Sequence, residues 1–125
     1  GTTDIRLIAP ETLHYKEETP GLERFGILKK GIEGADVIIS LRMQKERMIA
    51  ADIPDEQTYF ENFGLTNEAL KCAKSDVILM HPGPVNRGIE LESSVADGPH
   101  SVILQQVTNG IAVRMAVMVI LAGAF

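Results

Sequence analysis

The chain has 125 residues, which is enough for one domain and too few for a second independent hydrophobic core. Hydrophobic residues make up 45% of it and charged residues 23%, which excludes an intrinsically disordered protein. The formal net charge of -5 argues against sequence-independent binding of nucleic acid, so any bound anion must be attracted by a local cluster of cations.

The first half of the chain predicts a strand, a helix and a second strand. An apolar run at 5–9 predicts the first strand. Apolar residues then recur at three- and four-residue intervals over 22–32, as they would along one face of a helix. The next apolar run, at 35–41, does not alternate with polar residues, which is typical of a strand covered on both faces.

The second half predicts helices around a third strand. Asp55 is suited to cap a helix that ends at Gly64, and Thr66 is suited to cap a short helix after it. A strand is expected at 76–80 and a long helix at about 101–122. Because strands and helices alternate, we predict a single-domain α/β fold: an open parallel sheet with helices on both faces, doubly wound and Rossmann-like.

Cysteine usage and the two ends of the chain give further expectations. Cys72 is the only cysteine, so no intrachain disulfide can form; we interpret it as a small buried hydrophobic residue and expect a cytoplasmic protein. The apolar stretch at 111–125 contains Arg114 and is too short to span a bilayer, so we expect a buried or docking helix and no membrane. The abrupt start at Gly1 fits a fragment better than a whole gene product.

Cationic side chains follow the second and third predicted strands, where ligands bind in open α/β sheets. Arg42 and Gln44 would point to one side of an extended chain, where a guanidinium can hold a carboxylate and an amide can meet an amine. The alternative is that Arg42 pairs with Glu46 on an exposed turn. We interpret Lys45, Glu46 and Arg47 as a solvated charged face.

The loop after the third predicted strand begins His81-Pro82-Gly83-Pro84. The two prolines have no N–H, so nearby carbonyl groups are left without local partners and can point into a cleft, and an X-Pro bond there can be cis. Gly83 lets a ligand approach the backbone, which suits recognition of an NH₂ group. The alternative is a simple break between elements. We interpret His81 as a structural histidine rather than a catalytic base, and the wide spacing of the histidines predicts no metal site.

Three runs of this sequence resemble motifs of the aspartate transcarbamoylases. The residues at 41–48 resemble the family's L-R-x-Q-x-E-R loop, and those at 80–90 resemble its H-P-x-P-V-N-R-G-x-E segment. The residues at 105–115 resemble its Q-x-x-N-G-x-x-x-R helix. Relatives that use ornithine are expected to have a cysteine where Pro82 stands, so the resemblance favours aspartate.

The resemblance implies that residues 1–125 are an aspartate-binding domain without the N-terminal domain that holds carbamoyl phosphate. It implies that the residues that bind the carboxylates and amine of L-aspartate are Arg42 and Gln44. The residues whose backbone would meet the carbamoyl group of carbamoyl phosphate are Pro82, Gly83 and Pro84. Supporting residues would be His81, Arg87 and Glu90, the last two with structural or domain-closure roles. The family reaction makes N-carbamoyl-L-aspartate and phosphate for pyrimidine synthesis, without a cofactor.

Several motifs of the family are missing from this chain. They are a phosphate-binding Ser-x-Arg-Thr segment, a His-Pro-x-Gln segment and a further arginine that grips aspartate. We expect them upstream, in the N-terminal domain of the same subunit, and therefore expect the isolated chain to be inactive. The resemblance also implies a homotrimer, and leaves dihydroorotase-like or regulatory chains open as partners. The alternatives are a non-catalytic interaction or regulatory module that retains this fold, and an unrelated doubly wound domain that binds a small anion.

Overall fold

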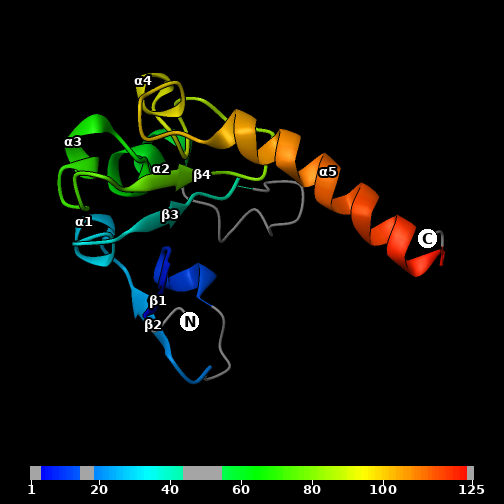
Figure 1. Ribbon diagram of the computed structural model, residues 1–125. Coiled ribbons are helices and arrows are strands. Elements are labelled where there is room, and N and C mark those ends of the chain that lie inside the picture. Colours follow the sequence, from blue (N-terminus) through cyan, green and yellow to red (C-terminus); the bar gives the residue numbers. More distant parts are fainter. Residues whose placement is uncertain (1–3, 15–18, 44–54, 124–125) are drawn as a thin grey trace.

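The computed structural model describes residues 4–14, 19–43 and 55–123. Its strands are β1 (Ile5–Ile8), β2 (Leu22–Phe25), β3 (Val37–Ile39) and β4 (Ile78–Met80). Its helices are η1 (Glu11–Leu13), α1 (Leu28–Gly31), α2 (Glu56–Phe63), α3 (Asn67–Leu70), α4 (Ser93–Ala96) and α5 (Ile103–Leu121). The strands form two parallel pairs, β1 with β2 and β3 with β4. Helices α2, α3 and α4 lie around the second pair, and α5 extends away from the body (Figure 1).

Parallel strands joined by helical segments confirm the predicted α/β class. Each of the three apolar runs predicted as strands contains one. The predicted helix at 22–32 is wrong in its first half, where the chain is the strand β2 and only α1 is helical. Leu22 lies opposite Ile5 in the parallel register, so pairing with β1 outweighs the helical spacing of the side chains.

Helix α2 begins and ends where the sequence predicts. The Oδ1 atom of Asp55 accepts hydrogen bonds of 3.0 Å from the backbone N–H groups of Gln57 and Thr58, which have no partner within the helix. At the other end, the N–H of Gly64 donates to the carbonyl of Phe60 at 2.8 Å. A Cβ atom at Gly64 would lie 2.4 Å from that carbonyl oxygen, so only glycine fits this close approach.

The cap of the next helix gives a first test. The Oγ1 atom of Thr66 accepts a 3.1 Å hydrogen bond from the N–H of Ala69 in the first turn of α3. Thr66→Ala removes this acceptor, and we expect it to lower the free energy of unfolding by about 1 kcal/mol. Urea denaturation measures the change. Thr66→Ser, which keeps the oxygen, is the matched control, and a Thr66→Ala protein as stable as the Ser variant would contradict the capping role.

One hydrophobic core lies around β4 and the short helices. Leu79, in the middle of β4, is fully buried. The free thiol Cys72 packs against the core and is half-buried, less than the sequence predicted. The buried residues of the core are Ile32, Leu65, Ala69, Leu70, Val77, Leu79, Leu91, Val95, Ala96 and Ile103.

The outer side chains of β3 remain accessible. Val37 is 47% exposed and Ile39 is 59% exposed, although the unbroken apolar run predicts a strand covered on both faces. Both residues line a cavity whose walls also include Leu7 and Ile8 of β1. In the described part of the chain the two strand pairs are distinct sheets.

The long C-terminal helix is confirmed, but its expected burial is not. Ile103 is the only buried residue of α5 among those described, and apolar residues such as Leu104 and Ile111 are exposed. The expectation that the apolar stretch is too short for a bilayer also needs correction, because the helix already begins at Ile103. By length and composition alone α5 could cross a membrane. A helix that packs on protein meets the same two criteria.

Candidate functional site

The two loops singled out by their sequence lie at one edge of the β3–β4 pair. Ile39 is opposite Met80, and the N–H of Ser40 donates to the carbonyl of Met80 at 2.9 Å. Arg42 follows Ile39 by three residues, and Gly83 follows Met80 by three. The segments that hold Arg42, which is half-buried, and the proline loop thus both leave the sheet at the same pair of strand ends. Gln44 and the charged residues at 45–47 lie outside the described residues, and so does the alternative pairing of Arg42 with residue 46.

The loop after β4 exposes its two prolines and buries its histidine. Pro82 and Pro84 are exposed, and His81 is 0% exposed. The peptide bond between Gly83 and Pro84 is cis, one of the geometries expected for this loop. Gly83 has φ +72°, a left-handed conformation that side chains other than glycine rarely adopt.

The N–H groups of this loop are bonded inward. The N–H of His81 donates to Oε1 of Gln106 in α5 at 2.9 Å. The N–H of Gly83 donates to Nδ1 of His81 at 2.9 Å. No group in the described ranges donates to the carbonyl oxygens of residues 81–84. Backbone carbonyls of this kind are the acceptors that a ligand with an NH₂ group requires.

His81 and Glu90 form a buried pair beneath the loop. Nε2 of His81 lies 3.3 Å from Oε1 of Glu90, and that oxygen also accepts a 2.6 Å hydrogen bond from the N–H of Asn86. Burial lowers the pKa of His81 below its usual value, and the opposing effect of the Glu90 charge is smaller. The imidazole is therefore neutral near pH 7. This geometry fits the interpretation of His81 as a structural histidine.

Arg87 lies on the outside of the same segment and is tied to the end of α4. Its guanidinium makes two parallel bonds to Asp97, of 2.6 Å and 2.8 Å, and a longer one to the carbonyl of Ser93. Both side chains are about half exposed or more, so the pair contributes little to stability. Its position favours a structural role over contact with substrate.

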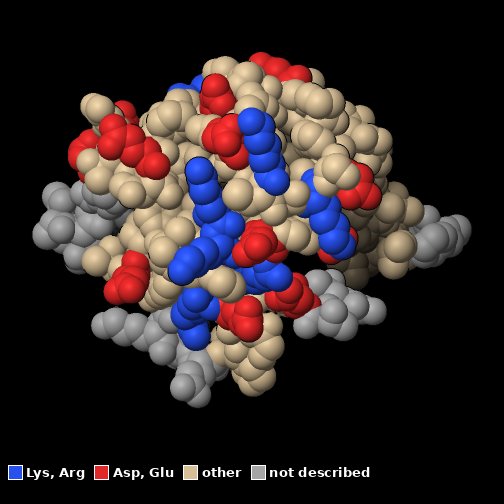
Figure 2. Space-filling view, turned by 90° about the vertical axis from the view of Figure 1, so that its left-hand side faces the viewer, with Lys and Arg blue, Asp and Glu red and all other residues tan. Residues whose placement is uncertain are grey.

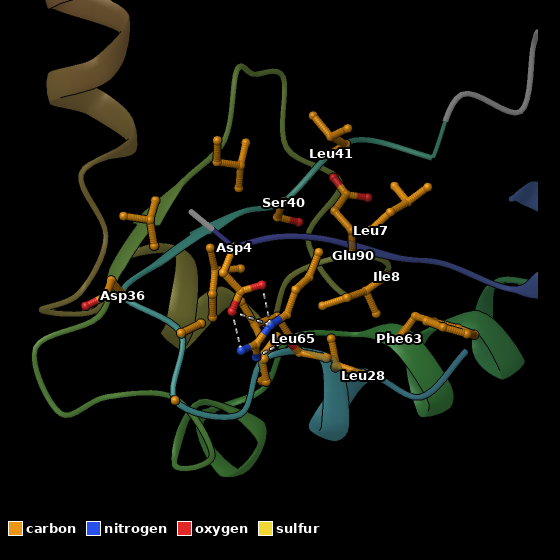
Figure 3. A pocket seen from close by; sticks show the side chains of 18 of the residues that line it. Asp4, Leu7, Ile8, Leu28, Asp36, Ser40, Leu41, Phe63, Leu65 and Glu90 are labelled. Atoms are coloured by element: carbon orange, nitrogen blue, oxygen red, sulfur yellow. Dashed lines mark hydrogen bonds and ion pairs between the residues drawn. The ribbon is translucent and has the colours of Figure 1, made fainter. Parts of the chain in front are cut away.

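A cavity of about 360 Å³ borders the first of these loops through Ser40 and Leu41, whereas Arg42 and residues 81–84 do not line it. Its walls come from β1, α1, β3 and the stacked rings of Tyr59 and Phe63 in α2. Glu90 reaches it at the end where Ser40 and Leu41 lie (Figure 3). Burial, together with the charge of Glu90, raises the pKa of Tyr59. The strand residues that line this cavity are largely apolar. The candidate site lies instead at the polar loops that follow β3 and β4.

The surface on the side of α1 and α3 carries both signs of charge. Basic and acidic side chains lie next to one another across it (Figure 2). The ion pairs recorded among the described residues include Lys71 with Glu68 and Lys74 with Asp36. Because acidic side chains are interspersed among the cations, this face is a poor match for the phosphate backbone of a nucleic acid.

Metal ligands are not grouped in the described ranges. Within residues 4–14, 19–43 and 55–123, no three His, Cys, Asp or Glu side chains are placed to hold a metal ion.

Sequence reasoning missed two contacts that shape the site. It did not place Glu90 against His81, and it gave no role to Gln106. The sequence does contain a sign of the contact between Glu90 and His81, because Glu90 is a carboxylate between the apolar residues Ile89 and Leu91. A charged residue in such a position is buried only with a partner. The side chain of Gln106 shares the spacing of the apolar residues of its helix, which hides its polar role.

Comparisons with known proteins agree on one family. A model described as aspartate/ornithine carbamoyltransferase, Asp/Orn binding domain, matches residues 4–121. The chain is 62% identical over 122 residues to the aspartate carbamoyltransferase catalytic subunit of Ruthia magnifica subsp. Calyptogena magnifica, covering 97% of this chain and 38% of that protein. It is 61% identical over 123 residues to the same subunit of Vesicomyosocius okutanii subsp. Calyptogena okutanii, covering 98% of this chain and 38% of that protein.

Solved structures share the fold. The ornithine carbamoyltransferase from Pyrococcus furiosus superposes with a TM-score of 0.72 and 28% identity, over 84% of this chain and 33% of that one. The aspartate transcarbamoylase from Trypanosoma cruzi, solved with carbamoyl aspartate and phosphate, gives a TM-score of 0.75 at 24% identity, over 93% of this chain and 40% of that one. The chain thus spans 38% of the length of the curated relatives described above.

Proposed function

Because the chain belongs to the aspartate/ornithine carbamoyltransferase family and matches its Asp/Orn binding domain, we propose that it is the L-aspartate-binding domain of an aspartate carbamoyltransferase. The observation that carries this proposal is the parallel pairing of β3 with β4, because the segments that hold Arg42 and the proline loop both leave the sheet at the carboxyl ends of these two strands. One loop offers a cation for a carboxylate, and the other offers carbonyl acceptors for an amide NH₂.

In the proposed reaction the amine of L-aspartate attacks the carbonyl carbon of carbamoyl phosphate. A carbon–nitrogen bond forms, the bond from that carbon to the phosphate oxygen breaks, and the amine loses a proton. Arg42 would hold a carboxylate of aspartate through two parallel bonds, with Gln44 beside it. The carbonyls of Pro82, Gly83 and Pro84 would accept from the carbamoyl NH₂ group. Catalysis would come from holding the two reactants in line and stabilising the developing oxyanion.

The remaining parts of this active site would come from sequence outside the chain. The chain corresponds to 38% of its curated relatives, and it contains no Ser-x-Arg-Thr segment to bind phosphate. We propose that an N-terminal domain of the same subunit supplies this segment, in a cytoplasmic homotrimer. The acidic chain would then contribute aspartate recognition, and the other domain would contribute most of the phosphate contacts.

Titration of the ¹⁵N-labelled chain with dicarboxylates tests the proposal. We expect L-aspartate and succinate to shift the amide signals of Arg42, Gln44 and Gly83, with a Kd on the order of 1–10 mM because half of the site is missing. L-Ornithine, which lacks the second carboxylate, should leave these signals in place. The amide of Gly21, just before β2 and away from both loops in sequence, serves as the internal reference.

A matched variant sharpens the test. Lysine keeps the charge of Arg42 but cannot make two parallel bonds, so Arg42→Lys should weaken aspartate binding by at least about tenfold. Shifts with ornithine rather than aspartate would point to the other substrate class of the family. If no dicarboxylate moved the three amides, the proposed aspartate site would be wrong.

A further inference from the structure

We propose that Glu90 and His81 are positioning residues: the buried carboxylate orients the imidazole ring, and the ring holds the Gly83 amide so that the loop presents its carbonyls to substrate. The inference rests on the proposed function, because it concerns the loop that would meet carbamoyl phosphate. It explains what holds that loop in its conformation, because hydrogen bonds between backbone groups alone do not.

The prolines explain why the loop depends on side chains. Between Pro82 and Asn86 only three residues carry a backbone N–H, because two of the five are prolines. Two of these three N–H groups are bonded to the buried pair: that of Gly83 to Nδ1 of His81, and that of Asn86 to Oε1 of Glu90. The pair therefore supplies bonds that a helix or sheet would supply elsewhere.

The contacts define which ring nitrogen carries the proton. Nδ1 of His81 accepts from the Gly83 N–H, so in the neutral ring the proton is on Nε2. Nε2 lies 3.3 Å from Oε1 of Glu90, close enough for electrostatic attraction but not aligned for a hydrogen bond. The negative charge of a carboxylate beside Nε2 favours the tautomer with its proton there and disfavours a flipped ring. Glu90 thus acts on Gly83 through His81.

Burial makes the arrangement specific. His81 is 0% exposed and Glu90 is 3% exposed, so water cannot replace either partner at low cost. The pair is also held from the other side, because Gln106 of α5 accepts from the N–H of His81. Gln106 of α5 thus holds the backbone of His81, and Glu90 lies against the edge of its ring.

Kinetics of the full-length enzyme provide the first test. Glu90→Leu keeps most of the side-chain volume and removes the acceptor, and we expect kcat/KM for carbamoyl phosphate to fall about 10- to 100-fold, as for other partners that orient a histidine. Glu90→Gln keeps an oxygen that can accept from both Asn86 and His81. It should stay within about threefold of the wild type. Equal losses in the two variants, or a folded Glu90→Leu enzyme with wild-type kcat and KM, would overturn the proposal.

If Glu90→Leu does not fold, a second pair of variants tests whether His81 positions Gly83. In His81→Asn the amide oxygen can stand at the place of Nδ1 and still accept from Gly83. In His81→Gln the amide nitrogen can reach the place of Nε2 and still donate to Glu90, but the acceptor for Gly83 is lost. We expect the Asn variant to retain at least about fivefold more kcat/KM than the Gln variant. The reverse order would show that the contact with Gly83 does not matter.

A readout that does not depend on turnover separates this inference from the proposed function. Ring ¹⁵N spectra of the 125-residue chain should show His81 with its proton on Nε2, and Glu90→Leu should change this to a mixture of tautomers. A wild-type ring that already shows a mixture would contradict the positioning role, even in an active enzyme. Conversely, a single Nε2–H tautomer in a protein that binds no aspartate would leave the pair intact and remove the proposed function.

Discussion

The isolated 125-residue chain should form N-carbamoyl-L-aspartate at least about 10⁴-fold more slowly than the full-length enzyme, since each lost donor to a developing oxyanion typically costs 10²–10³ in kcat and more than one is missing. The described residues at the loop edge supply one half-buried arginine and a row of carbonyl acceptors. Acceptors cannot stabilise an oxyanion or a departing phosphate, which require N–H groups or cations. Colorimetric detection of carbamoyl-aspartate at saturating substrate measures the rate.

The control for this experiment is the same chain extended upstream to include a Ser-x-Arg-Thr segment. We expect the extended protein to be active, and Arg42→Ala in it to abolish most of that activity. Subunit-like turnover by the isolated chain would contradict the division of the site between two domains. An extended protein that binds aspartate but transfers no carbamoyl group would favour the non-catalytic module instead.

Leu79→Ala should lower the free energy of unfolding by about 3–4 kcal/mol, a large part of the 5–15 kcal/mol typical of a domain. Leu79 is 0% exposed and lies in the centre of the core. Its N–H donates to the carbonyl of His100 at 2.8 Å, and its carbonyl accepts from Val102 at 2.9 Å, so the surrounding backbone is held and cannot collapse into the space left by the side chain. Urea denaturation of the 125-residue chain measures the loss.

The neighbouring residue of the same strand provides the matched control. Ile78 is 43% exposed, because successive side chains of β4 point to opposite faces. We expect Ile78→Ala to cost less than about 1 kcal/mol, since much of its surface is already in contact with water. Similar losses for Ile78→Ala and Leu79→Ala would mean that the core does not lie on the face of β4 that the structure shows.

The helix ends could be predicted because they depend on local chemistry. Asp55 and Thr66 carry the oxygen atoms that a first turn needs, and both side chains accept from the expected N–H groups. Gly64 stands where the chain approaches the carbonyl of Phe60 too closely for any side chain. Each of these features is determined by residues a few positions apart, which is the range that a sequence pattern describes.

The strand β2 could not be predicted in the same way. Its apolar residues have helical spacing, and its extended conformation depends on pairing with β1, a contact between distant parts of the chain. Similarly, the apolar run of β3 predicts a covered strand, whereas Val37 and Ile39 are exposed in this chain. An apolar composition indicates that a strand favours burial, but only the structure shows whether other elements cover it.

The candidate site was predicted as two loops, and the structure adds what lies beneath them. Strand order alone predicts that Arg42 and the proline loop share one edge of the sheet, and the parallel pairing of β3 with β4 is the arrangement that this prediction requires. The aspartate ligand role of Gln44 stays a prediction, since that residue is outside the described ranges. The contact of His81 with Glu90 joins residues nine positions apart in an irregular segment, for which no periodic pattern exists.

The helix α5 is long and, among the described residues, is held near one end only, at the end that contacts the proline loop. At 1.5 Å per residue its 19 residues form a rod about 28 Å long that is held at its base, where Ile103 is buried and Gln106 accepts from His81. A rotation of roughly 10° about that base would move the far end near Leu121 by about 5 Å but would move Gln106 by less than about 1 Å. A displacement of the tip would therefore reach the N–H of His81 only strongly reduced.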